Sequence, residues 1–147
     1  MASFYDGKML VSLALFALIT LSRGKLLGAP EDIGLNDDRV QDAAEFAVDE
    51  WNKMSNAMYL SQLVEVLSAK QQVVHGYNYI MTIEIGPTTC RNEPDIDVTQ
   101  CKLDKTQQHS ICEVTVNVLQ DKPENEPTMT FAQRKPMCTT VEKLIGD

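Results

Sequence analysis

The hydrophobic and polar positions of the chain follow two different periods, which predict one helix and then a series of strands. Between residues 37 and 54, apolar side chains recur every three or four positions, as on one face of a helix. This stripe consists of Val40, Ala44, Ala47, Trp51 and Met54, and it is widened by Ala43 and Val48. Asn36 can cap the helix, and the acidic Asp37 and Asp38 suit its positive end. We therefore expect an amphipathic helix from about Asp37 to Met54.

A period of two, typical of strands, follows this helix. Residues 60–73 are rich in Val and Leu, residues 77–85 and 112–118 alternate between apolar and polar, and residues 128–131 form a shorter candidate. Gly86-Pro87 is expected to end the second strand, and residues 139–147 are expected to form a short tail. The pattern predicts an α+β fold, with one long helix packed across a four- to five-stranded antiparallel sheet.

The first residues carry a different signal. Residues 9–21 form an apolar run of thirteen, which is short against the roughly 20 residues of a membrane-spanning helix. With small residues following at Ser22 and Gly24, the run is typical of a secretory signal. We expect residues 1–24 to be a signal peptide, residues 25–147 to be the folded domain, and no membrane segment after cleavage. A buried N-terminal helix is the alternative, but the run lacks a polar face.

Charge narrows the classes of partner. The whole chain has a net charge of −8, and residues 25–147 have −9, from eleven Lys and Arg against twenty Asp and Glu. No cluster of Lys or Arg occurs in the sequence, so binding of nucleic acid is not expected.

Four cysteines, Cys90, Cys101, Cys112 and Cys138, follow the predicted helix. An even number together with a secretory signal indicates two disulfides. Three connectivities are possible, of which the sequential one closes the shortest loops. A zinc site is the competing interpretation, but no Cys-x-x-Cys pair is present, and His75 and His109 lack the spacing of ligands.

Catalytic motifs are missing from the sequence. There is no Gly-x-Ser-x-Gly, no phosphate-binding loop and no His-Glu-x-x-His. If both disulfides form, no cysteine is free to act as a nucleophile beside a histidine. We expect no enzyme activity, no catalytic residue, no metal and no cofactor.

The segment Gln72-Val73-Val74-His75-Gly76 joins two predicted strands and therefore forms a hairpin turn. Gly76 can adopt the positive φ that a tight turn requires. Valines exposed on such a turn would form an apolar wedge for docking. Alternatively, the strands run on and both valines pack inside. His75 is either a titrating group or simply a variable position at the tip.

These residues resemble the Gln-x-Val-x-Gly signature of the cystatins, which inhibit papain-like cysteine proteases. Leu26-Leu27-Gly28 is similar to the N-terminal segment of that family, in which apolar residues precede a glycine. One helix before the signature and four cysteines after it match the secreted, disulfide-bonded type 2 cystatins. The resemblance extends over nearly all of residues 26–138.

The resemblance implies a reversible, competitive and non-covalent inhibitor that plugs the cleft of a cathepsin-type protease. The implied protease-binding residues are Leu26, Leu27, Gly28, Gln72, Val73, Val74, His75, Gly76, Pro123 and Glu124. In the family, Pro-Trp stands on the second hairpin, whereas here Pro123 precedes Glu124. Because an aromatic anchor typically contributes about 2–4 kcal/mol to binding, we expect weaker inhibition and altered selectivity.

Some secreted cystatins also inhibit the asparaginyl protease legumain through an exposed Asn after the helix, and Ser55-Asn56-Ala57 resembles that site. The family usually has Asp or Ser where Ala57 stands, and an ordinary Asn at a helix end is the alternative. A secreted, extracellular monomer is expected. A second hypothesis for the whole chain is a secreted cystatin-like binding protein with weak or no protease inhibition.

Overall fold

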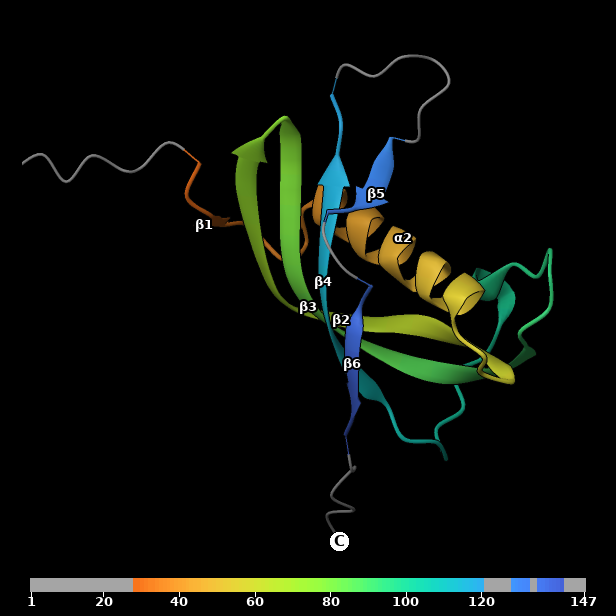
Figure 1. Cartoon of the computed structure of the whole chain (residues 1–147). Helices are drawn as coiled ribbons and strands as arrows, with labels where there is room; N and C mark the ends of the chain where they lie inside the picture. Colours follow the sequence, from red (N-terminus) through yellow and green to blue (C-terminus); the bar gives the residue numbers. More distant parts are fainter. Residues whose placement is uncertain (1–27, 121–127, 133–134, 142–147) are drawn as a thin grey trace, which may run out of the picture.

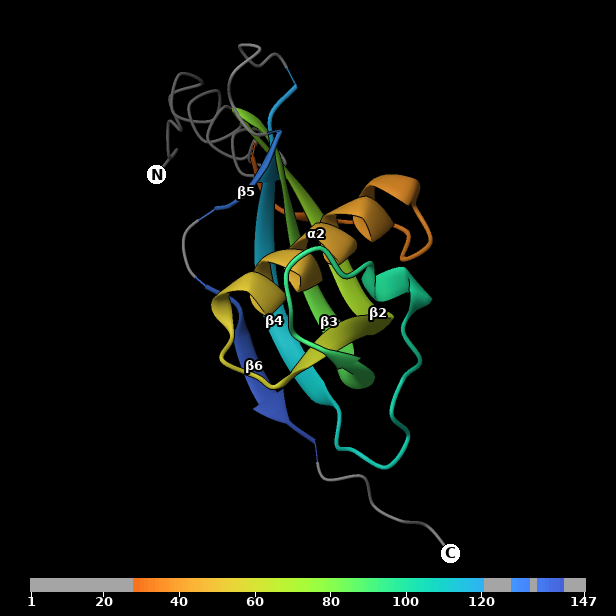
Figure 2. The same ribbon diagram turned by 90° about the vertical axis from the view of Figure 1, so that its right-hand side faces the viewer.

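One helix crosses one face of a six-stranded antiparallel sheet (Figures 1 and 2). The computed structural model describes residues 28–120, 128–132 and 135–141. The elements are β1 (Glu31–Asp32), α2 (Asp38–Met54), β2 (Tyr59–Val74), β3 (Gly76–Arg91), the 3-10 turn η1 (Val98–Gln100), β4 (Ser110–Val118), β5 (Met129–Phe131) and β6 (Met137–Thr140). The sheet order is β1-β2-β3-β4, and both β5 and β6 pair with the outer edge of β4. The predicted α+β architecture is confirmed.

The helix begins one residue later than a cap at Asn36 would place it. Asp37 is the N-cap, and its side chain accepts a hydrogen bond from the backbone N–H of Arg39. Its carboxylate also binds the Arg39 guanidinium at 2.8 Å, which lowers the pKa of Asp37. Asp37 is favoured over Asn36 because its side chain can bind both the helix N-terminus and a cation.

The apolar stripe of α2 packs onto the sheet, except at its last position. Val40, Ala43, Ala44, Ala47 and Val48 are buried, and Trp51 is partly buried against the same core. Met54, expected in the stripe, is 37% exposed, whereas the polar Asn52 is only 6% exposed. The expectation for Met54 is wrong because this side chain, on the last residue of the helix, lies outside the core cluster.

The long hairpin β2–β3 forms the middle of the sheet. Val73 pairs with Tyr77, and pairing continues to Tyr59 opposite Arg91. The expectation that Gly86-Pro87 ends the second strand is wrong. Ile85 is the last residue of β3 that pairs with β4, but the strand continues because Pro87 still pairs with Ser61 of β2. On its other side, residues 102–104 lie alongside, and the Pro87 carbonyl accepts a hydrogen bond of 2.8 Å from the backbone N–H of Asp104.

Two short strands, β1 and β6, were not indicated by the pattern. Glu31 and Asp32 of β1 pair with Gln71 and Lys70 of β2. In β6, Thr139 and Thr140 pair with Ile111 and Ser110, so the tail predicted from residue 139 begins as a strand. Both strands are too short for a period of two to be visible, and pairing with a long neighbour defines them.

The core lies between α2 and the sheet. Tyr79, Met81, Ile83 and Ile85 of β3 and Cys112, Val114 and Val116 of β4 all bury their side chains there. The connectivity of the cysteines is the sequential one, Cys90–Cys101 and Cys112–Cys138. These bonds use all four cysteines, which overturns the zinc alternative. Each closed loop adds about 3 kcal/mol of stability in the chain-entropy description.

Candidate functional site

Three segments that are distant in sequence meet at one end of the sheet. The turn of the β2–β3 hairpin lies there, and the register of Tyr77 with Val118 brings the end of β4 beside it. On the other side, β1 pairs with β2 only five residues before the tip, so the chain at Gly28 reaches the same end. Figure 1 shows the tip between these two neighbours.

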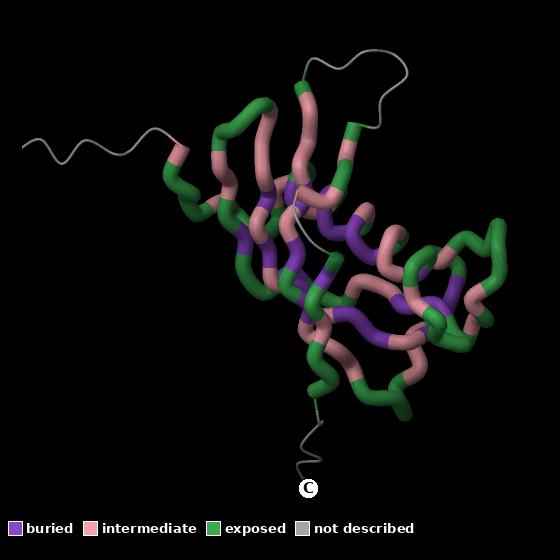
Figure 3. Tube along the Cα trace, viewed as in Figure 1, coloured by how far each residue is buried: buried purple, intermediate pink, exposed green. Residues whose placement is uncertain are grey.

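The hairpin tip exposes both valines. Val74 pairs with Gly76, so the chain reverses around His75. Val73 is 62% exposed and Val74 is 42% exposed, and Figure 3 shows the exposed tip above the buried middle of the strands. The alternative in which both valines pack inside is therefore wrong. His75 is also exposed and is the only titratable residue from Gln72 to Gly76, so the tip offers apolar side chains and backbone groups.

Gly76 is required by its backbone and by its surroundings. Its φ is +93°, a conformation that L side chains rarely adopt. A Cβ atom added there would lie 2.2 Å from the carbonyl oxygen of Val118 and 3.1 Å from Cα of Leu119. The tip therefore lies directly against the backbone of β4, and this close approach fixes its position.

Gln72 connects the N-terminal segment to the hairpin. Its side-chain Nε2 donates a hydrogen bond of 2.6 Å to the carbonyl oxygen of Gly28. Gly28 also has a φ of +93°, and a Cβ atom there would lie 3.7 Å from the carbonyl oxygen of Val73. Gly28 thus lies beside the tip. Leu26 and Leu27, which precede it, lie outside the described residues.

The second hairpin begins beside the first. The backbone N–H of Leu119 donates to the carbonyl oxygen of Thr128 at 3.0 Å, and Val118 pairs with Met129. Across the sheet, the Asn117 side chain donates to the Asn78 side chain at 2.8 Å and links the two hairpins. Pro123 and Glu124 lie outside the described residues.

Asn56 lies at the opposite end of the sheet, in the segment between α2 and β2. Asn56, Ala57 and Met58 are all exposed. The segment is anchored by two residues that the sequence reasoning missed. Asn52 exchanges two hydrogen bonds of 2.8 Å with the backbone N–H and carbonyl of Ser61. Asn92 donates its backbone N–H to the Met58 carbonyl and its side chain to the Asn52 carbonyl, both at 2.9 Å.

The only sequence signal for Asn52 is that a polar residue interrupts the apolar stripe of the helix. Such an interruption does not by itself predict a buried hydrogen bond.

In the described ranges, no group of three or more His, Cys, Asp or Glu side chains is placed to hold a metal ion. No helix in this part of the chain combines the length and the apolar character needed to cross a bilayer.

Comparison with known proteins agrees with this geometry. A family model for the cystatin domain matches residues 28–121. The chain is 48% identical over 80 residues to Cystatin from Coturnix japonica, covering 54% of this chain and 68% of that protein. It is 43% identical over 91 residues to Cystatin-C from Saimiri sciureus, covering 59% of this chain and 62% of that protein. The chain thus spans about two thirds of the length of these relatives.

Among solved structures, dimeric human cystatin F superposes with a TM-score of 0.68 at 25% identity. The superposition covers 83% of this chain and 94% of that chain. The family match covers more than half of the chain and includes the hairpin, the helix and the first disulfide. From the sequence motifs, the fold and this match together, the chain belongs to the cystatin family.

Proposed function

We propose that this protein is a reversible, competitive inhibitor of papain-like cysteine proteases of the cathepsin type. It would act by inserting the hairpin tip into the active-site cleft, with Leu26 and Leu27 on one side of the tip and the second hairpin on the other. The family is one of protease inhibitors, not of enzymes. The single observation that carries this proposal is the exposure of Val73 and Val74 on a turn fixed against β4.

The geometry suits inhibition without cleavage. The tip presents two apolar side chains at a sharp reversal, and the pairs Val73–Tyr77 and Val74–Gly76 hold the reversal closed. A preformed hairpin loses little conformational entropy on binding. Apolar side chains that enter a desolvated cleft contribute most of the binding free energy. Inhibition would therefore depend on shape and burial and would require no covalent step.

In this proposal, Gln72 positions another segment of the inhibitor. Its hydrogen bond to Gly28 aligns the N-terminal segment with the hairpin, so that both can enter one cleft. Gly28, at a positive φ, would allow the preceding leucines to adjust to the apolar subsites of the protease.

The test compares two charged substitutions on one strand. Val74→Asp, at the tip, is expected to raise the inhibition constant against papain by about 30- to 1000-fold, which corresponds to about 2–4 kcal/mol. Leu67→Asp, on the same strand and equally exposed at 42%, serves as the matched control and is expected to leave the constant unchanged. If the two variants inhibit alike, the tip is not the binding element.

A second protease site is proposed at Asn56, for legumain. The residue is exposed at the end of the sheet remote from the hairpin tip, in a segment held by Asn52 and Asn92. Asn56→Ala is expected to abolish inhibition of legumain and to leave inhibition of papain intact. Retention of legumain inhibition by this variant would contradict the site.

The remaining parts of the proposal concern location and assembly. We propose that residues 1–24 are a signal peptide and that residues 25–147 act as a secreted, extracellular monomer. The two disulfides support an oxidising compartment. Glu124 in place of the family's Trp favours one alternative, a secreted cystatin-like binding protein with weak or no inhibition. The absence of papain inhibition at micromolar concentration would favour that alternative.

A further inference from the structure

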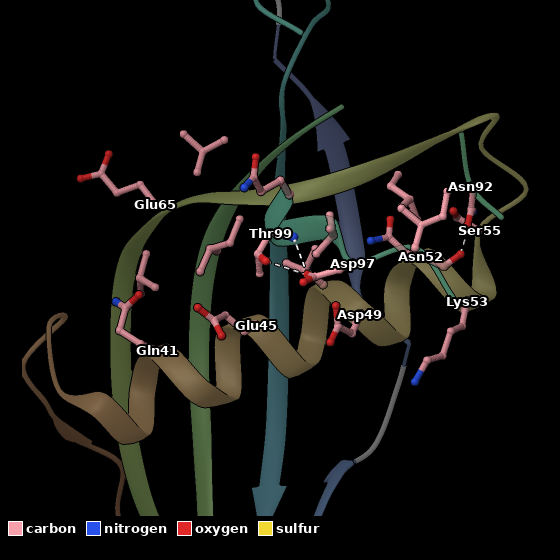
Figure 4. A pocket seen from close by; sticks show the side chains of 18 of the residues that line it. Gln41, Glu45, Asp49, Asn52, Lys53, Ser55, Glu65, Asn92, Asp97 and Thr99 are labelled. Carbon is pink, nitrogen blue, oxygen red and sulfur yellow. Dashed lines mark hydrogen bonds between the residues drawn. The ribbon is translucent and has the colours of Figure 1, made fainter. Parts of the chain in front are cut away.

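We propose that the groove between α2, the first half of β2 and residues 92–99 binds an amphiphilic amine, a small molecule with an apolar body and a protonated amino group (Figure 4). The cavity volume is about 1250 Å³, somewhat larger than the roughly 300–1000 Å³ of pockets that hold drug-sized ligands. The groove includes neither the hairpin tip nor Asn56, but Asn52 and Asn92, which hold the segment of Asn56, line one end of it. The proposal therefore does not rest on the hairpin tip.

Apolar side chains from three elements line the groove. Val48 of α2 and Leu60 and Val66 of β2 are buried and form its floor. Val64 and Ile96 stand at its opening, and each is 39% exposed. The floor has little remaining contact with water, so the free energy gained from a ligand's hydrocarbon would come chiefly from covering Val64 and Ile96.

The charges that line the groove are almost all negative. Six carboxylates, those of Glu45, Asp49, Glu65, Glu93, Asp95 and Asp97, face one cationic group, that of Lys53. The Lys53 ammonium is already paired with Glu50 at 2.6 Å. The Glu45 and Asp49 carboxylates have no hydrogen-bond or ion-pair partner among the described residues. An incoming cation would therefore meet acceptors that are not engaged elsewhere.

Asp49 is the best placed of these groups. Burial raises its pKa, the positive charge of Lys53 opposes this shift, and the negative charges of Glu50 and Asp97 add to it. Asp49 is nevertheless exposed, so an incoming cation can reach its carboxylate without displacing a partner in the protein. Figure 4 shows Glu45 and Asp49 extending from α2 toward the segment that carries Asp97.

The wall opposite α2 is fixed in place. The Cys90–Cys101 disulfide closes the loop that contains residues 92–99, and Asn92 binds the Met58 carbonyl. Asp97 accepts hydrogen bonds from the backbone N–H and the hydroxyl of Thr99, which lower the pKa of its carboxyl. This wall thus keeps a negative charge and a stable shape, and a preformed site costs a ligand little reorganisation.

The chemical class of the ligand follows from the apolar floor of the groove and the carboxylates that surround it. An anion would be repelled by the six carboxylates, and a neutral apolar molecule would gain nothing from them. A protonated amine with a hydrocarbon chain satisfies both features of the groove.

The experiment titrates the full chain with three probes of equal chain length, decylamine, decanol and decanoate, at neutral pH and low salt. Amide resonances observed by ¹⁵N–¹H correlation spectra report the site. Decylamine is expected to shift the amides of Glu45, Asp49, Ile96 and Thr99 and to bind at least about tenfold more tightly than decanol. Decanoate is expected not to bind. Equal binding of the three probes would overturn the proposal.

Substitutions test which carboxylates bind the amine. The double substitution Glu45→Gln with Asp49→Asn is expected to weaken decylamine binding at least about tenfold. Asp42→Asn, on the same helix but outside the groove, is the matched control and is expected to bind as the unaltered protein does. Unchanged binding by the double variant would overturn the proposal. A basic peptide of Lys and Leu is titrated in parallel. If this peptide shifted these amides and decylamine did not, the proposal would also be overturned, because the occupant would then be a protein partner.

Discussion

At the hairpin end of the sheet the tip is positioned by a close backbone contact, whereas at the opposite end the segment before β2 is positioned by polar side chains. The tip at Gly76 lies against the Val118 carbonyl because glycine leaves room for close approach. At the other end, Asn52 and Asn92 hold the segment before β2 through side-chain hydrogen bonds. The contact at Gly76 leaves the side chains of Val73 and Val74 exposed, whereas the side chains of Asn52 and Asn92 are used for hydrogen bonds within the protein.

This contrast shows how one fold can carry two separate surfaces. Where the backbone fixes a loop, the outward side chains, such as Val73 and Val74, can vary without loss of shape. Where side chains fix a loop, a single polar residue determines whether the loop keeps its position. We therefore expect substitutions at the two ends to affect different properties of the protein.

The largest effect is expected from Gly76→Ala. The strained positive φ typically costs about 1–3 kcal/mol, and the approach to the Val118 backbone places the expected loss of unfolding free energy near the upper limit. Inhibition of papain should also fall more than about tenfold, because the tip must move. Urea unfolding and inhibition constants check both effects. Gly34→Ala is the control, since nothing lies within 4 Å of a Cβ atom there. Equal stability of the two variants would contradict the structural role of Gly76.

Asn52→Ala is expected to lower the free energy of unfolding by about 1–3 kcal/mol, because the Ser61 N–H and carbonyl lose their partner in a buried place. The segment containing Asn56 should loosen, so inhibition of legumain should weaken while inhibition of papain persists. Thermal unfolding and the two inhibition constants are the measurements. The control, Asn56→Ala, removes an exposed Asn and should leave stability unchanged. A loss of papain inhibition in Asn52→Ala would show that the two ends are not independent.

Glu124→Trp is expected to strengthen inhibition of papain by about tenfold, or about 1.4 kcal/mol, because an aromatic anchor is added to the second hairpin. Glu124→Gln separates the two contributions, since it removes the charge without adding a ring. An unchanged inhibition constant for Glu124→Trp would mean that this hairpin does not contact the protease.

The smallest effect concerns pH. Burial raises the pKa of Asp49 above its ordinary value of 3.8, so the folded protein holds this proton more tightly than the unfolded chain does. The contribution of Asp49 to stability is greatest below 3.8 and falls as the pH rises through the raised value. Asp49→Asn should therefore be slightly more stable at neutral pH, by less than about 0.5 kcal/mol, and the gain should vanish in acid. Carboxyl NMR titration checks the pKa, and Asp42→Asn controls for the lost charge.

The pattern of apolar and polar residues is enough to predict the helix, the long strands and their order along the chain. The stripe from Val40 to Trp51 predicted α2, and alternation predicted the long strands, because these patterns record which faces meet the core. The signature Gln72 to Gly76 indicated a turn, since glycine at its end permits a positive φ. The sequential disulfides were among the three connectivities that the spacing allowed.

Features that depend on contacts between distant residues become visible only in the folded chain. The course of β3 through Gly86-Pro87 depends on its continued pairing with β2 and with residues 102–104, and the strands β1 and β6 exist only through their neighbours. The burial of Asn52 depends on Ser61, and the alignment of Gly28 depends on Gln72. A local pattern reports the period of one segment, whereas hydrogen bonds between segments are formed only when the chain has folded.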